Sequence, residues 1–248
     1  MKTLITFLPS VLFDLITLVR NKLFDWGILA STSFEKPRII CVGNLAVGGT
    51  GKSPLVSYLV QNWRGDDRLA ILSRGYGRKT KGYIDVKVDS TAEEVGDEPL
   101  AYKTLFPELP VVVCENRVKG VQQMPAVDVL FLDDAFQHRK VRAGFSILVS
   151  DFNAPFFNDF ILPIGNLREP RRGAKRADLV LFTKCPSEIS ADTKKRYTEK
   201  AARHGLRAFF SKIAYAPLQS VNGIPLPEAT HALLVTGIAN PQPLKNHL

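Results

Sequence analysis

Apolar residues follow two patterns that take turns along most of the chain: short continuous runs and longer segments with helical spacing. After Pro37, short runs rich in β-branched residues recur, separated by longer segments of helical spacing or by loops. This alternation predicts an α/β fold in which flanking helices cover a mostly parallel sheet. We expect strands at residues 38–42, 69–72, 110–113, 129–132, 146–149 and 179–182. Because parallel sheets bind ligands at the carboxyl ends of their strands, the chemistry is expected where these runs end.

The first 30 residues predict an amphipathic helix over 10–26. Its apolar face carries Leu12, Leu15, Ile16, Val19, Leu23 and Trp26. Pro9 and several charges interrupt the apolar run before about 18 uncharged residues accumulate, which argues against a transmembrane helix. A signal peptide is also rejected, because neither a basic start nor a small-residue cleavage site is clear. The helix is expected either to lie in a membrane interface or to pack on the core, and the sequence leaves both alternatives open.

Further helices are predicted at 53–63 and 191–204. Ser190 is a suitable N-cap for the second of these, and Gly205 suits its end. A proline-punctuated stretch then leads to a short strand at 233–236. We therefore divide the chain into an N-terminal helix region (1–30), a core (31–213) and the beginning of a smaller C-terminal domain (214–248).

The strongest chemical signal is the segment Ala46-Val-Gly-Gly-Thr-Gly-Lys-Ser53, between a predicted strand and a predicted helix. Glycines let the backbone curl so that N–H groups converge on phosphate oxygens, and the helix N-terminus favours the same negative charge. This pattern predicts a P-loop NTPase-like fold that binds ATP. The expected nucleotide-binding residues are Val47, Gly48, Gly49, Thr50, Gly51, Lys52 and Ser53. Lys52 would reach the β- and γ-phosphates, and the Ser53 hydroxyl would ligate Mg²⁺.

A second signal is the apolar strand that ends in Asp133 and Asp134. In P-loop enzymes an aspartate in this position holds Mg²⁺ directly or through water. Adjacent side chains on an extended backbone point in opposite directions, so the two carboxylates are expected to do different jobs. The sequence does not decide which of them meets the metal.

Four other groups are candidates for chemistry. Asp97, at the start of an expected helix, is either a helix cap or the carboxylate that orients the nucleophile and accepts its proton. Arg74 follows a strand end and could contact phosphate, or it lies in a solvated loop. Arg168 suits an oxyanion, and Glu169 suits a metal or its water. His138 is either structural or catalytic.

The formal net charge of +9 predicts an anionic partner. Nucleic acid is disfavoured, because the arginines between Arg168 and Arg176 lack interleaved aromatic residues. The three cysteines, Cys41, Cys114 and Cys185, are widely spaced and form no metal-binding or disulfide pattern, which favours a reducing compartment.

Taken in order, these motifs resemble tetraacyldisaccharide 4′-kinase, the lipid A kinase family of Gram-negative bacteria. The resemblance rests on the segments Val42–Pro54, Ser73–Arg78, Gly96–Pro99, Asp133–Arg139, Leu162–Pro170 and Thr236–Pro241. It implies transfer of the ATP γ-phosphate to the 4′-hydroxyl of an acylated glucosamine disaccharide 1-phosphate. It also implies a monomer whose N-terminal helix touches the anionic cytoplasmic face of the inner membrane.

The resemblance also assigns residue roles. Asp97, Lys52 and Arg168 become the catalytic residues, and Ser53, Asp133, Asp134 and Glu169 become the Mg²⁺ environment. Substrate contacts are expected from Asn44, Arg74, Gly75, Tyr76, Glu98 and His138.

Two features depart from the family pattern. Ala135 stands where the family usually has glycine, which matters only if that backbone requires a positive φ. The family also has an Asp-His-His segment beyond the turn at 236–241, and one of those histidines pairs with the catalytic aspartate. The sequence stops before such a segment, so we expect the chain to lack a large part of its second domain. A kinase or ligase of a soluble metabolite, or a nucleotide-binding module without turnover, remain as alternatives.

Overall fold

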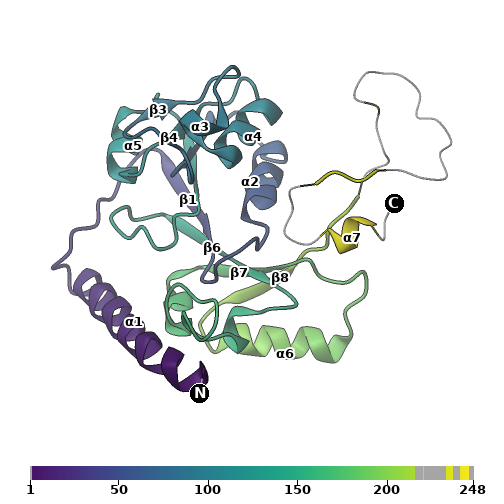
Figure 1. Ribbon diagram of the computed structural model, residues 1–248. Helices are drawn as coiled ribbons and strands as arrows, with labels where there is room; N and C mark the ends of the chain where they lie inside the picture. Colours follow the sequence, from purple (N-terminus) through teal and green to yellow (C-terminus); the bar gives the residue numbers. More distant parts are fainter. Residues whose placement is uncertain (1, 216–219, 221–232, 237–240, 246–248) are drawn as a thin grey trace.

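The computed structural model describes residues 2–215, 220, 233–236 and 241–245. Its centre is an eight-stranded sheet of order β3-β4-β2-β5-β1-β6-β7-β8 (Figure 1). The strands are β1 (Arg38–Gly43), β2 (Leu69–Ser73), β3 (Ile84–Asp85), β4 (Val111–Val113), β5 (Val129–Asp133), β6 (Phe145–Asp151), β7 (Leu179–Thr183) and β8 (Arg207–Phe210). All neighbours pair in parallel except β3, which runs antiparallel to β4. The predicted α/β class is therefore confirmed.

Helices cover both faces of this sheet. The α-helices are α1 (Lys2–Asp25), α2 (Lys52–Gln61), α3 (Ala92–Val95), α4 (Asp97–Leu105), α5 (Arg117–Gln123), α6 (Ala191–Ala202) and α7 (Gln242–Lys245), with 3-10 turns η1 (Phe156–Asn158) and η2 (Arg171–Arg176). One core layer joins the sheet to α2 and α4 through Val56 and Tyr102. The other joins it to α5 and α6 through Val121 and Tyr197. Since both faces are buried, the strands read as continuous apolar runs.

The six predicted strands are all present, with ends shifted by one or two residues. The two predicted core helices are also confirmed: α2 begins at Lys52, and the Ser190 hydroxyl accepts a hydrogen bond from the Thr193 N–H at the start of α6. The strand predicted at 233–236 is wrong. Leu233 and Val235 are 91% and 84% exposed, and no strand in the described part of the chain pairs with them.

Helix α1 runs along the outside of the molecule (Figure 1). It begins before the predicted start and includes Pro9. Its apolar residues face outward, with exposed fractions of 49–74% for Leu8, Val11, Leu12, Leu15, Ile16 and Val19. Polar Ser10 and Thr17 are the residues buried against the core. Packing of the apolar face on the core, one of the two alternatives, is therefore not what the structure has.

Two ion pairs hold the polar face of α1 to the core. The Arg172 guanidinium lies 2.8 Å from the Asp14 carboxylate, and Arg139 lies 2.7 Å from Asp25. Among the described residues, no helix has the length and apolarity needed to cross a membrane.

Candidate active site

The predicted phosphate loop connects the end of β1 to the start of α2. Gly48 and Gly51 have φ values of +99° and +87°, a conformation that side chains with a Cβ rarely adopt. No atom lies within 4 Å of the Cβ positions of Gly48 and Gly49, so the loop presents open backbone. The N-terminus of α2 follows at Lys52. The segment thus has the curled backbone and the helix N-terminus that a phosphate cradle requires.

Side chains from distant strands hold this loop in shape. Asn44, at the end of β1, donates from Nδ2 to the Thr50 hydroxyl at 2.9 Å. The Thr183 hydroxyl, at the end of β7, donates to the Thr50 carbonyl at 2.7 Å. Lys184 follows with φ +56°, and its Nζ donates to the Gly49 carbonyl at 2.6 Å. The loop is therefore fastened from both sides at the carboxyl edge of the sheet.

Lys184 is a site residue that the sequence analysis missed. Its ammonium also meets the Asp151 carboxylate at 2.7 Å, so it joins the ends of β6 and β7 to the loop.

We expect Lys184→Met to weaken Mg-ATP binding about fivefold, because a charge-assisted hydrogen bond that orders the loop is lost at a partly exposed position. Calorimetric titration of the parent and the variant measures the effect. Lys195→Met, on the exposed side of α6, is the matched control and should bind like the parent; equal affinities for all three proteins would contradict the expectation.

The two adjacent aspartates have different surroundings, and Asp134, with φ +46°, does not continue the extended backbone of β5. The Asp134 carboxylate is half-exposed, with Arg168 Nη1 at 3.0 Å and Lys52 Nζ at 3.7 Å. Asp133 is 3% exposed, and its Oδ1 has no hydrogen-bond partner. Burial, followed by the nearby Asp134 charge, raises the pKa of Asp133 to about 6. The Tyr102 hydroxyl is buried close to both Ser53 and Asp133, without a well-formed hydrogen bond to either.

A divalent cation fits at Asp133. A buried carboxylate oxygen without a partner is a suitable ligand for a hard cation, and the Tyr102 hydroxyl lies near both this carboxylate and Ser53. Within the described ranges, no three His, Cys, Asp or Glu residues are grouped so as to enclose a metal ion. This small donor set suits Mg²⁺, which usually takes one or two protein carboxylates and completes its shell with phosphate oxygens and water.

The structure places Glu169 in a different network from the one predicted. Its carboxylate is 3% exposed and accepts hydrogen bonds from Arg176 at 2.6 Å, Gln137 at 3.0 Å and Asn21 at 3.0 Å. These donors engage both of its oxygens. Its predicted role beside the metal remains a prediction.

Close packing of two glycine turns seats Asp97 at the start of α4. Gly96 has φ +94°, and a Cβ there would lie 2.9 Å from the Tyr76 carbonyl. A Cβ on Gly75 would in turn meet the Val95 carbonyl at 2.6 Å. The basic turn of residues 73–78 therefore lies directly against the segment that begins α4. Glu98 is near enough to Asp133 to contribute to its raised pKa, so this end of α4 faces the aspartate pair.

Arginines surround the predicted substrate residue His138. Burial, and then the charges of Arg117, Lys140, Arg20 and Arg74, lower the pKa of His138 to about 4. The imidazole is therefore neutral at pH 7. The structure thus brings the predicted residues Arg74 and His138 into one cationic region.

Arg117 is a further residue that the sequence analysis did not identify. It is 3% exposed, its Nε has no hydrogen-bond partner, and no carboxylate within the described residues forms an ion pair with it. Burial, and then the neighbouring Arg74, lower its pKa to about 10. An arginine buried in this way, close enough to Asp133 and Asp134 for their charges to raise its pKa, is suited to an anionic ligand.

Two predicted substrate residues differ sharply in accessibility. Tyr76 is 81% exposed, whereas Asn44 is fully buried and holds Thr50. Asn44 is thus placed to shape the phosphate loop. Gly75 is buried in the turn beside Gly96.

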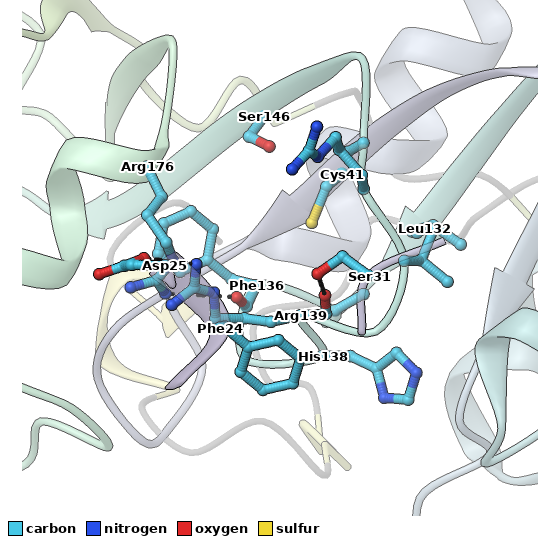
Figure 2. A pocket seen from close by; sticks show the side chains of 14 residues that line it. Phe24, Asp25, Ser31, Cys41, Leu132, Phe136, His138, Arg139, Ser146 and Arg176 are labelled. Atoms are coloured by element: carbon cyan, nitrogen blue, oxygen red, sulfur yellow. Dashed lines mark hydrogen bonds and ion pairs between the residues drawn. The ribbon is translucent and has the colours of Figure 1, made fainter. Parts of the chain in front are cut away.

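A separate cavity of about 360 Å³ lies between the end of α1 and the loop after β5 (Figure 2). Cys41 and Leu132 line its floor, and His138, Arg139 and Arg176 lie around it. None of the phosphate-loop residues lines this cavity. It is a hollow at the α1 interface rather than the nucleotide site.

Comparison with known proteins agrees with this geometry. The family model "Tetraacyldisaccharide-1-P 4'-kinase" matches residues 2–248. The chain is 42% identical to the tetraacyldisaccharide 4'-kinase of Bacteroides thetaiotaomicron, over 96% of this chain and 68% of that protein. It is 43% identical to the Flavobacterium psychrophilum enzyme of the same name, over 100% and 74%.

A solved structure also matches the fold. The crystal structure of "apo" form LpxK from Aquifex aeolicus in complex with ATP has a TM-score of 0.64 and 30% identity, over 90% of this chain and 84% of that one. The P-loop kinase fold that the glycine-rich segment predicts is thereby confirmed. With the family model matching nearly every residue, the chain belongs to the tetraacyldisaccharide-1-P 4'-kinase family.

Proposed function

We propose that this protein transfers the γ-phosphate of ATP to the 4′-hydroxyl of a tetraacyldisaccharide 1-phosphate, a lipid A precursor. The observation that carries the proposal is the phosphate loop with Lys52 at the start of α2, facing Asp134 and Arg168 at the carboxyl edge of the sheet. Family membership supplies the acceptor. Measuring ADP formation with the lipid acceptor and with a soluble glucosamine disaccharide tests it: we expect turnover that requires the acylated acceptor.

The residues of the site have separate roles in the transfer. Backbone N–H groups of the loop, together with Lys52, hold the β- and γ-phosphates and offset the charge that spreads over the transferred group. Arg168 lies beside Asp134, where its guanidinium can reach the same charge. Asp97, exposed at the start of α4, accepts the proton of the attacking hydroxyl.

Mg²⁺ belongs to this site as the partner of ATP. Asp133 and Ser53 would hold it, and when bound it neutralises charge on the phosphate oxygens. Arg74 and Arg117, both close to the neutral His138, provide a positively charged region for the phosphate that the lipid acceptor already carries.

The outward apolar face of α1 supports action at a membrane surface. A helix that turns Ser10 and Thr17 inward and exposes leucine, isoleucine and valine is poorly matched to water and well matched to the headgroup boundary of a bilayer. The net charge of +9 favours anionic lipid. We propose that the protein acts, as a monomer, at the cytoplasmic face of the inner membrane of a Gram-negative bacterium.

Vesicle flotation tests the membrane-facing role of α1. Leu12 and Ile16 lie one turn apart, with exposed fractions of 57% and 56%. We expect the double variant Leu12→Asp/Ile16→Asp to bind anionic phospholipid vesicles at least about tenfold more weakly, because two apolar side chains no longer enter the bilayer. Val88→Asp, with a 62% exposed apolar side chain remote in sequence from α1, is the control. Equal vesicle binding by the double variant and the control would refute this role of α1.

A further inference from the structure

A chain of hydrogen bonds connects α1 to the phosphate loop. The Asn21 side-chain amide donates to Glu169 Oε2 at 3.0 Å, and Gln137 Nε2 donates to Glu169 Oε1 at 3.0 Å. The same Gln137 amide group donates to the Asn44 carbonyl at 2.8 Å. Asn44 in turn donates to the Thr50 hydroxyl at 2.9 Å. Four hydrogen bonds thus lead from the helix on the outside of the molecule to the centre of the nucleotide site.

The interior of this chain has little freedom to rearrange. Glu169 is 3% exposed and Asn44 is fully buried, so water does not readily replace a lost partner. Arg176 fixes the Glu169 carboxylate from a third direction, at 2.6 Å. Gln137 uses both amide hydrogens, one toward Glu169 and one toward Asn44. A shift of Glu169 would therefore move Gln137, and with it the backbone that carries Asn44.

A second set of contacts joins the same turn of α1 to the loop after β5, which carries Gln137 and Arg139. The Arg20 guanidinium donates to the Gln137 carbonyl, and Arg139 Nη1 donates to the Asn21 carbonyl at 2.7 Å. Figure 2 shows Arg139 and Asp25 together beside Phe24, where the last turn of α1 meets the loop after β5. Both the side chain and the backbone of Asn21 are thus engaged at the point where the chain of bonds begins.

We propose that Asn21 is a positioning residue for the nucleotide site, so that the seating of α1 on the core helps to set the shape of the phosphate loop. The inference rests on the proposed function in one respect, that this loop binds ATP. Coupling between two sites is reciprocal, so nucleotide binding would also tighten the seating of α1. A change in how α1 packs on the core would therefore change the affinity of the phosphate loop for ATP.

The test measures Mg-ATP affinity of the full chain by calorimetry. We expect Asn21→Ala to raise the Kd for Mg-ATP about three- to tenfold, the effect of losing one hydrogen bond to a buried carboxylate. Asp14→Asn is the matched control: it removes another α1 contact, the ion pair with Arg172, without entering the chain of bonds, and should leave the Kd unchanged. Vesicle binding of Asn21→Ala should equal that of the parent, because the apolar face is intact.

A double-mutant cycle distinguishes positioning from a general loss of stability. In a Gln137→Ala background the chain is already broken, so Asn21→Ala should add no further loss of affinity. The inference is overturned by a parental Kd in Asn21→Ala, by an equal loss in Asp14→Asn, or by an undiminished further loss in the Gln137→Ala background. A parent chain that does not bind Mg-ATP overturns the proposed function together with this inference, and that result is distinguishable because it appears before any substitution is made.

Discussion

Replacing Lys52 with alanine is expected to lower phosphate transfer at least about 100-fold and to weaken Mg-ATP binding. The Lys52 side chain is only 12% exposed, and its ammonium is 3.7 Å from Asp134, at the edge where the loop amides converge. Removing it takes away a positive charge directed at the terminal phosphates. It also leaves the Asp134 carboxylate with Arg168 as its only ion-pair partner within the described residues. Transfer rates and the Kd for Mg-ATP measure both effects.

A matched control keeps the two effects attributable to the site. Lys87→Ala removes an exposed lysine that has no ion pair in the described part of the chain. It should bind and turn over ATP like the parent. If Lys52→Ala binds Mg-ATP as tightly as Lys87→Ala, the loop does not grip the terminal phosphates and the nucleotide site is misassigned.

Asp97→Asn should lower kcat about 10²- to 10⁴-fold while leaving the Kd for Mg-ATP unchanged. An amide cannot accept the hydroxyl proton, and Asp97 lies at the start of α4, outside the loop that holds the phosphates. Of the two roles that the sequence left open, the structure does not have the helix cap: Gly96 occupies the N-cap position of α4, and no side chain makes a capping hydrogen bond there. Asparagine keeps the size and polarity of this exposed side chain, so a residue with no part in proton transfer would leave activity at the parental level.

The denaturant midpoint of Asp97→Asn is the accompanying measurement. We expect it to match that of the parent, which would show that a slow variant is folded. Asp89→Asn, an exposed carboxylate in the turn before α3, is the control and should keep full activity. Parental kcat in Asp97→Asn would rule out Asp97 as the proton acceptor.

Local patterns accounted for most of what the sequence predicted correctly. The phosphate loop follows from glycines at positions that adopt positive φ, and the strands follow from apolar runs long enough to be buried on both faces. The strands β3 and β8 were not predicted, because they lack such apolar runs. The first has two residues, and β8 alternates exposed with half-buried positions, so neither has the apolar run of a central strand.

Residues that reach the site from afar in sequence could not be predicted in this way. Lys184 is 135 positions from its partner Gly49, and Gln137 is 93 positions from Asn44. A lysine after a strand or a glutamine in a turn has no local signal of its own. Arg117 was missed similarly, because burial of an arginine without a carboxylate partner is visible only once the strands are assembled.

The direction of α1 shows a different limit. Helical spacing predicts an apolar face equally well whether the face points to the core or away from it. The polar side of α1 faces the core here through the ion pairs of Asp14 and Asp25 with arginines, and those partners lie more than 100 positions away. At Ala135 the structure answers whether the backbone requires glycine. The φ of Ala135 is not positive, so alanine replaces the usual family glycine without backbone strain.

Following the γ-phosphate itself tests the proposed lipid kinase activity most directly. Incubating the chain with γ-labelled ATP, Mg²⁺ and tetraacyldisaccharide 1-phosphate in anionic vesicles should place the label on the lipid, and Lys52→Ala should not do so. Label released to water at the same rate with and without the lipid, or retained on ATP throughout, would contradict the claim that this phosphate loop serves a lipid kinase.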